Sequence, residues 1–155
     1  MNRLKILNKN EKREIENKLK KQFGIQNIPG IIVKRSEERL FLFSGNFNKR
    51  QIKKLEDLVI IERIGVYFAN IFGGEIRLSI EGSQILKDQI KKNIFELDKE
   101  QAEEWMMGRE LLIKTGKRGF LIMKYNDDFL GTGKASQEKI GNFVPKSRRL
   151  KNREN

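Results

Sequence analysis

The residues in this chain best suited to chemistry are cations, and they lie close to a pair of glycines. A Gly-x-Gly-Lys run, Gly131-Thr132-Gly133-Lys134, is followed by a second cationic run, Pro145-Lys146-Ser147-Arg148-Arg149. Glycines at alternate positions of a strand leave one face without side chains, which permits a bulge or the close approach of another backbone. A flat glycine surface beside clustered Arg and Lys suits a phosphate backbone better than a small apolar ligand.

The Gly-x-Gly-Lys run does not complete a nucleotide-binding loop. A Walker loop needs another Gly where this chain has Asp128, and a Ser or Thr where it has Ala135. A dinucleotide fingerprint needs Gly at the position of Ser136. Both nucleotide-binding motifs are therefore incomplete. A strand crossing in a small barrel explains the glycine pair. We therefore expect no cofactor.

Composition removes several classes of catalytic site. The chain has no Cys and no His, which excludes disulfides, Cys/His zinc sites, thiolate nucleophiles and imidazole bases. The neighbouring carboxylates Asp127-Asp128 and Glu103-Glu104 are more typical of a turn and of a solvated helix face. We expect no catalytic and no metal-ligating residue, so the chain is predicted not to be an enzyme.

The positive charge is concentrated at the two ends of the chain. Of the net charge of +12, residues 1–21 carry +5, with eight Lys/Arg against three Glu. Residues 134–155 carry another +5, with seven Lys/Arg against two Glu. Clustered cations favour a polyanionic partner, because binding releases condensed counterions. A basic protein that is merely solvated is the alternative.

Before residue 91, the hydrophobic pattern predicts helices alternating with short strands. A helix over 11–23 has Asn10 as its cap and Gly24 as its terminator. A second helix begins with a capping-box pattern at Asn48 and Gln51, with Phe47 stapled onto Ile52. Ser83 is predicted to cap a third helix that ends near Ile90, and Gly73-Gly74 forms a turn. The strands are expected at 31–34, 40–44, 59–64, 66–72 and 75–80.

Residues 91–93 form a short polar segment, which is the expected boundary between two regions. A strand over 94–97 leads into a helix over 98–107, which Asp98 and Gln101 begin as a capping box and Gly108 ends. Trp105 could stack on a nucleobase, but its helical spacing from Ala102 favours the core. A strand over 110–114 and a hairpin that starts at Phe120 and turns at 126–128 complete the region.

This order resembles a PUA domain, the small pseudo-barrel of pseudouridine synthases and archaeosine transglycosylases, in which an apolar strand and a turn precede Leu-Gly-x-Gly. Here those residues are Leu130 to Gly133. The preceding residues resemble the pre-PUA domain of small ribosome-biogenesis factors of archaea and eukaryotes. They also resemble the auxiliary RNA-binding region associated with Nop/Sun-type RNA cytosine methyltransferases. The resemblance implies an α+β fold: a pre-PUA domain (1–92) with a mostly antiparallel sheet, a PUA β pseudo-barrel (93–150) and a basic tail (151–155).

The resemblance also implies where RNA would lie: along the segment from the first PUA helix into the second strand, and along the last strand. Gly108 would let a sugar-phosphate come close, and the arginines could fork onto phosphate oxygens. The alternatives are simple helix termination for Gly108 and a solvated tail for Arg148 and Arg149. The expected RNA-binding residues are Gly108, Arg109, Lys114, Lys117, Arg118, Lys134, Lys146, Arg148 and Arg149.

We therefore expect an RNA-binding protein that acts on ribosomal RNA in ribosome biogenesis. One alternative is a non-catalytic RNA-binding subunit of a methyltransferase-type system that modifies tRNA or rRNA; a Nop/Sun enzyme needs a catalytic Cys, which this chain lacks. Another is a protein-interaction scaffold. The expected partners are RNA, with pre-ribosomal particles or an RNA-modifying enzyme. The longest apolar runs are only a few residues, so no membrane partner and a cytoplasmic location are expected.

Overall fold

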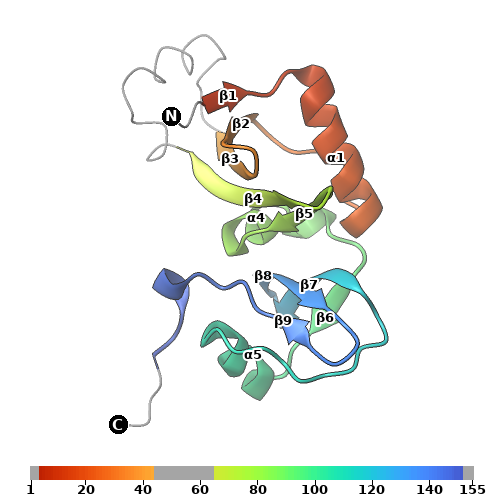
Figure 1. Ribbon diagram of the computed structural model, residues 1–155, viewed down its shortest axis with the longest axis vertical. Helices are drawn as coiled ribbons and strands as arrows, with labels where there is room; N and C mark the ends of the chain where they lie inside the picture. Colours follow the sequence, from red (N-terminus) through yellow and green to blue (C-terminus); the bar gives the residue numbers. More distant parts are fainter. Residues whose placement is uncertain (1–3, 44–64, 152–155) are drawn as a thin grey trace.

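The first sheet of the computed structural model is antiparallel throughout, with strand order β1-β2-β3-β4-β5. The structure describes residues 4–43 and 65–151 (Figure 1). The strands are β1 (Leu4–Ile6), β2 (Ile31–Arg35), β3 (Arg39–Phe43), β4 (Val66–Phe72) and β5 (Glu75–Leu78). The α+β class and the mostly antiparallel first sheet are thus confirmed. The helix predicted at Asn48 and the strand predicted at 59–64 lie outside the described residues.

Helix α1 (Lys9–Phe23) covers one face of this sheet with a buried stripe of Ile15, Leu19 and Phe23. Its cap is Asn8, so the prediction of Asn10 is wrong. The Asn8 side chain accepts from the Glu11 amide at 2.9 Å, and the Glu11 carboxylate accepts from the Asn8 amide at 3.1 Å. This reciprocal pair needs an acid three residues after the cap, which Asn8 has and Asn10 lacks. Gly24 ends the helix at φ +80°, as predicted.

The strand predicted over 75–80 ends earlier, because Ser79 caps the next helix, α4 (Ile80–Ile85). The prediction that Ser83 is the cap is therefore wrong. Ser83 is fully buried, where its hydroxyl donates to the Ile80 carbonyl at 2.8 Å and accepts from the Gly131 amide at 3.1 Å. Helix α4 packs directly on β4, since a Cβ at Gly82 would lie 2.1 Å from the Phe68 carbonyl oxygen. A 3₁₀ turn, η1 (Lys87–Gln89), follows.

The second sheet has the order β6-β7-β8-β9, with β6 parallel to β7 and the other pairs antiparallel. Its strands are β6 (Ile94–Glu96), β7 (Gly119–Tyr125), β8 (Asp128–Ala135) and β9 (Ile140–Gly141). Helix α5 (Lys99–Met106) begins with the predicted capping box of Asp98 and Gln101. The strand predicted over 110–114 is wrong. That segment makes one isolated bridge, Leu111 with Ile140, and is otherwise a loop.

The glycine pair in β8 is buried and packs against other elements of the molecule. The β7–β8 register shifts between Ile122 and Lys124, and Gly131 at φ +82° lies at this bulge. A Cβ on Gly131 would be 3.4 Å from the Ile80 amide nitrogen, and one on Gly133 would be 2.8 Å from the Trp105 ring. The predicted bulge and close backbone approach are confirmed. The expectation of a flat glycine surface for phosphate is wrong, because both glycines are buried.

One of the hydrophobic core clusters spans both sheets. A single cluster joins Leu19, Phe23 and Phe68 from the first part to residues of the second, which are Phe120, Ile122 and Phe129. Figure 1 shows α4 between the two sheets. Polar contacts also cross the junction: the Thr132 hydroxyl donates to the Leu78 carbonyl at 2.9 Å. Each sheet therefore depends on the other for part of its burial.

In residues 4–43 and 65–151, we find no helix with both the length and the apolar character that crossing a bilayer requires.

Candidate nucleic-acid interface

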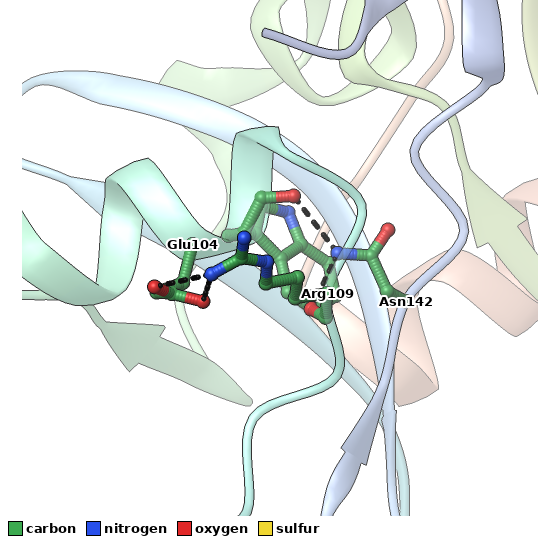
Figure 2. A network of polar contacts seen from close by, with 4 residues as sticks. Glu104, Arg109 and Asn142 are labelled. Carbon is green, nitrogen blue, oxygen red and sulfur yellow. Dashed lines mark hydrogen bonds and ion pairs between the residues drawn. The ribbon is translucent and has the colours of Figure 1, made fainter. Parts of the chain in front are cut away.

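Arg109 is held firmly at the end of α5. Its guanidinium donates from one nitrogen to both carboxylate oxygens of Glu104, each at 2.9 Å. Asn142, which follows β9, donates to the carbonyl oxygens of Trp105 at 2.8 Å and Arg109 at 2.9 Å. Figure 2 shows Asn142 and Glu104 on opposite sides of Arg109. The ion pair neutralises Arg109 locally, while half of its side chain remains exposed.

Trp105 itself is part of the core. It is 0% exposed, and its indole nitrogen donates to the Leu130 carbonyl at 3.0 Å. The prediction of core packing is confirmed, and Trp105 is not available to stack on a base.

Three predicted cations meet in the loop between α5 and β7. Lys114, Lys117 and Arg118 are exposed and line a depression of about 350 Å³, together with Ser136 and Gln137 of the β8–β9 turn. Lys114 lies 3.6 Å from Glu138, whereas Lys117 and Arg118 make no ion pair with any described residue. The Thr115 hydroxyl accepts from the Lys117 amide at 3.0 Å and shapes the turn. Two unneutralised cations therefore face solvent here.

The exit segment, defined as residues 142–151, docks back onto the rest of the molecule. It contains a 3₁₀ turn, η2 (Lys146–Arg148). Arg148 forms an ion pair with Glu81 of α4, and the Leu150 amide donates to the Met106 carbonyl at 2.7 Å. The exit segment is therefore docked and is not a free tail, but the Arg148 and Arg149 side chains are exposed, so the alternative that they are merely solvated stays a prediction.

Gly108 and Arg149 are brought together. Gly108 has φ +86°, and a Cβ there would lie 2.3 Å from Arg149 Nε. The same Nε donates to the Val144 carbonyl at 3.0 Å. The missing side chain of Gly108 thus makes room for the Arg149 guanidinium, so a phosphate that approached Gly108 would meet Arg149 first.

Lys134 lies on β8, where it pairs with Phe120 of β7, two residues after Arg118. Its ammonium nitrogen is 5.2 Å from the centre of the Phe72 ring and 6.0 Å from that of Phe120. The predicted residues therefore come from three parts of the chain, which are the α5 end with the exit segment, the α5–β7 loop, and β8.

A second depression, beside α5, is lined by acidic side chains, in contrast to the cationic loop. The first turns of α5 and the adjoining loop line this groove of about 390 Å³, which is rich in carboxylates, with Leu112 exposed beside it. The acids are Asp98, Glu100, Glu104 and Glu110. Glu104 and Glu110 are paired with Arg109 and Lys139, whereas Asp98 and Glu100 make no ion pair with a described residue. The groove therefore favours phosphate less than the exit segment and the loop cations do. Among the described residues, no group of acids is arranged to hold a metal ion.

Sequence reasoning missed Arg77. Its guanidinium carbon lies 4.2 Å from the centre of the Phe143 ring, within the range of a cation–π contact. The alternation of Ile76 and Leu78 with Arg77 could have shown that Arg77 points away from the core. No local pattern, however, indicates the contact with Phe143.

Comparison with known proteins shows what these features are similar to. Residues 92–150 match the family model described as the methyltransferase RsmF PUA domain. The chain is 30% identical over 131 residues to ribosomal RNA small subunit methyltransferase F of Psychromonas ingrahamii, covering 81% of this chain and 26% of that protein. It is 31% identical over 135 residues to the protein of the same name in Aeromonas salmonicida, covering 86% and 26%.

The chain spans about a quarter of the length of these curated relatives. Its small second sheet, which the Leu111 bridge to Ile140 extends beyond β9, is a curled half-barrel and is consistent with the PUA-like fold expected from the sequence. Residues 92–150 are therefore similar to the PUA domain of RsmF methyltransferases, and their fold is consistent with that likeness.

Proposed function

We propose that this chain is a non-catalytic module that binds ribosomal RNA through its phosphates. The observation that carries the proposal is the docked exit segment. Arg149 is anchored over Gly108, so the cations around it are presented on a folded frame rather than on a free tail. A preorganised cation loses less conformational entropy when it binds a phosphate. The relatives' printed names, which refer to small-subunit ribosomal RNA, favour rRNA over tRNA.

The proposed contact residues fall into two groups with different roles. Lys117, Arg118 and Lys146 make direct phosphate contacts, because no described carboxylate neutralises them. Lys114, which lies 3.6 Å from Glu138, joins them once that exposed pair opens. Arg109, Arg148 and Arg149 also contact phosphates, and Gly108 leaves the space that Arg149 occupies. Arg109 and Arg148 already pair with Glu104 and Glu81, so they would have to exchange an acid for a phosphate. Lys134 belongs to a separate contact beside Phe72.

We further infer that the chain itself does not transfer methyl groups, and that it serves a methyltransferase-type system in the cytoplasm. It contains no cysteine, the residue that the Nop/Sun resemblance requires for catalysis. The proposed division is a pre-PUA domain over 1–92, a PUA domain over 93–150 and a tail over 151–155. Because the core crosses the junction, we expect the two domains to unfold together.

A binding competition tests the proposal. A fluorescent fragment of small-subunit rRNA is titrated with the full chain, and unlabelled tRNA or unlabelled rRNA fragment is then added. We expect rRNA to displace the probe at concentrations at least roughly tenfold lower than tRNA, a difference of about 1.4 kcal/mol. Equal displacement would favour the tRNA alternative or unspecific binding. The absence of RNA binding at low salt would refute the proposal and leave the scaffold alternative.

A further inference from the structure

A pocket of about 250 Å³ lies where the two sheets meet, and none of the predicted RNA-binding residues lines it. One wall comes from the first sheet, with Tyr67 and Arg77. The opposite wall comes from β8 and the exit segment, with Phe143 and Pro145. The volume is below the roughly 300–1,000 Å³ typical of pockets for drug-sized ligands. It therefore suits a single planar ring system.

Each aromatic ring of the pocket is flanked by an arginine. Arg39 lies with its guanidinium carbon 4.8 Å from the centre of the Tyr67 ring, and Arg77 lies 4.2 Å from that of Phe143. The two arginines come from β3 and β5, on either side of Asn70 in β4, which pairs in register with both. Directly paired residues share a face of a sheet. Both cations therefore lie on the face away from α1.

The remaining polar groups of the pocket are mostly committed to the fold. The Ser79 hydroxyl donates to the Tyr67 carbonyl at 2.8 Å, and the Thr132 hydroxyl donates to the Leu78 carbonyl at 2.9 Å. Arg77, by contrast, has no carboxylate partner among the described residues. Its planar donors remain available at the pocket, and Lys146 follows Pro145 at the rim. The site thus combines rings, a free guanidinium and a nearby ammonium group.

We propose that this junction pocket takes up one unpaired nucleobase of a bound RNA strand, while Arg77 and Lys146 contact its flanking phosphates. This inference rests on the proposed function and deepens it, because it specifies single-stranded RNA as the preferred form. Aromatic side chains stack on any base, and loss of one such stack typically reduces affinity by roughly five- to 150-fold. Within a duplex, bases are already stacked and paired, so duplex RNA cannot enter the pocket without opening.

Photo-crosslinking of the unaltered full chain tests the pocket without any substitution. The probe is an oligoribonucleotide with a single central 5-iodouridine, used either single-stranded or annealed to its complement. The crosslinked peptides are identified by mass spectrometry. We expect the single strand to crosslink to Tyr67 or Phe143, and the duplex to give no crosslink at these rings. Crosslinks of the single strand confined to other parts of the chain, such as the 114–118 loop, would overturn the proposal.

Matched variants test the ring and the cation separately. Phe143→Leu keeps an apolar side chain but removes the ring, and we expect roughly tenfold weaker binding of the single strand with unchanged duplex binding. Arg77→Gln should weaken single-strand binding by a similar factor. Arg13→Gln, an exposed position on α1, removes the same charge and should weaken both probes equally by less than about threefold.

The outcomes separate this proposal from the function on which it rests. If the unaltered chain binds neither probe, the proposed function fails. If it binds both probes but Phe143→Leu and Arg77→Gln behave like Arg13→Gln, the RNA function stands and the pocket proposal is refuted. Thermal melting of each variant shows whether it is folded. If Phe143→Leu does not fold, the crosslinking result on the unaltered chain decides.

Discussion

Replacement of Gly108 by alanine should reveal how tightly the exit segment is docked. At φ +86°, an L residue is strained by about 1–2 kcal/mol. The new Cβ would also lie 2.3 Å from Arg149 Nε, so the guanidinium must move and lose its hydrogen bond to the Val144 carbonyl. That hydrogen bond contributes about 1 kcal/mol. We therefore expect Gly108→Ala to lower the free energy of unfolding by about 2–3 kcal/mol.

Gly116→Ala is the matched control, because Gly116 has φ +75° and no atom within 4 Å of its would-be Cβ. Gly116→Ala should lower the free energy of unfolding by the conformational strain alone, about 1–2 kcal/mol. The free energy of unfolding of each variant is measured by urea denaturation. Together with Arg149→Ala and the double variant Gly108→Ala/Arg149→Ala, Gly108→Ala forms a double-mutant cycle. The double variant should be about 1 kcal/mol more stable than the sum of the single changes predicts. Equal costs for Gly108→Ala and Gly116→Ala, with additive effects in the cycle, would refute the docked position of Arg149.

Three further expectations concern the fold and the chemistry. Gly82→Ala should lower the melting temperature severely, because the new Cβ would lie 2.1 Å from a backbone oxygen of β4. Gly141→Ala, whose Cβ would lie 3.7 Å from its nearest atom, should melt nearly as the parent does, and similar melting curves for the two variants would contradict the packing of α4. The hydrogen bond from Lys5 lowers the pKa of Glu11 below its ordinary value. The contribution of Glu11 to stability is therefore present above that ordinary value and is lost as the pH falls through the lowered pKa. Glu11→Gln should reduce the acid-induced loss of stability measured by melting, and an unchanged pH profile would count against it. Isothermal titration calorimetry with the methyl donor should give no heat of binding, and micromolar affinity would overturn the non-catalytic assignment.

Elements with strong local signals were predictable from the sequence. The α5 capping box of Asp98 and Gln101, the buried stripe of α1 and the turn at Asn126 all depend on neighbours within a few residues. The cap of α1 was also readable in principle, because Asn8 has Glu11 three residues later. The start of α4 was not. The alternation Ile76, Leu78, Ile80 continues the strand signal into the helix, and the packing of Gly82 on β4 is a tertiary contact.

The candidate site was predictable in its residue types but not in its arrangement. Charge clustering pointed to the exit segment, yet its contacts link residues far apart in the chain. Arg148 pairs with Glu81, and Arg149 fills the space over Gly108. Neither contact leaves a periodic signal. The β8 glycines were misread as an outer surface for the same reason, because only the folded chain shows Ile80 and Trp105 packed against them.

The salt dependence of RNA affinity tests the central claim most directly, namely that the folded exit segment and loop cations bind RNA phosphates. With roughly four to six phosphates neutralised, the logarithm of affinity should fall against the logarithm of salt concentration with a slope of about −3 to −5. Substitution of Lys146, Arg148 and Arg149 by alanine should weaken binding by roughly tenfold or more and reduce the slope by about two to three units. A slope near zero for the parent, or an unchanged slope and affinity in the triple variant, would contradict the claim.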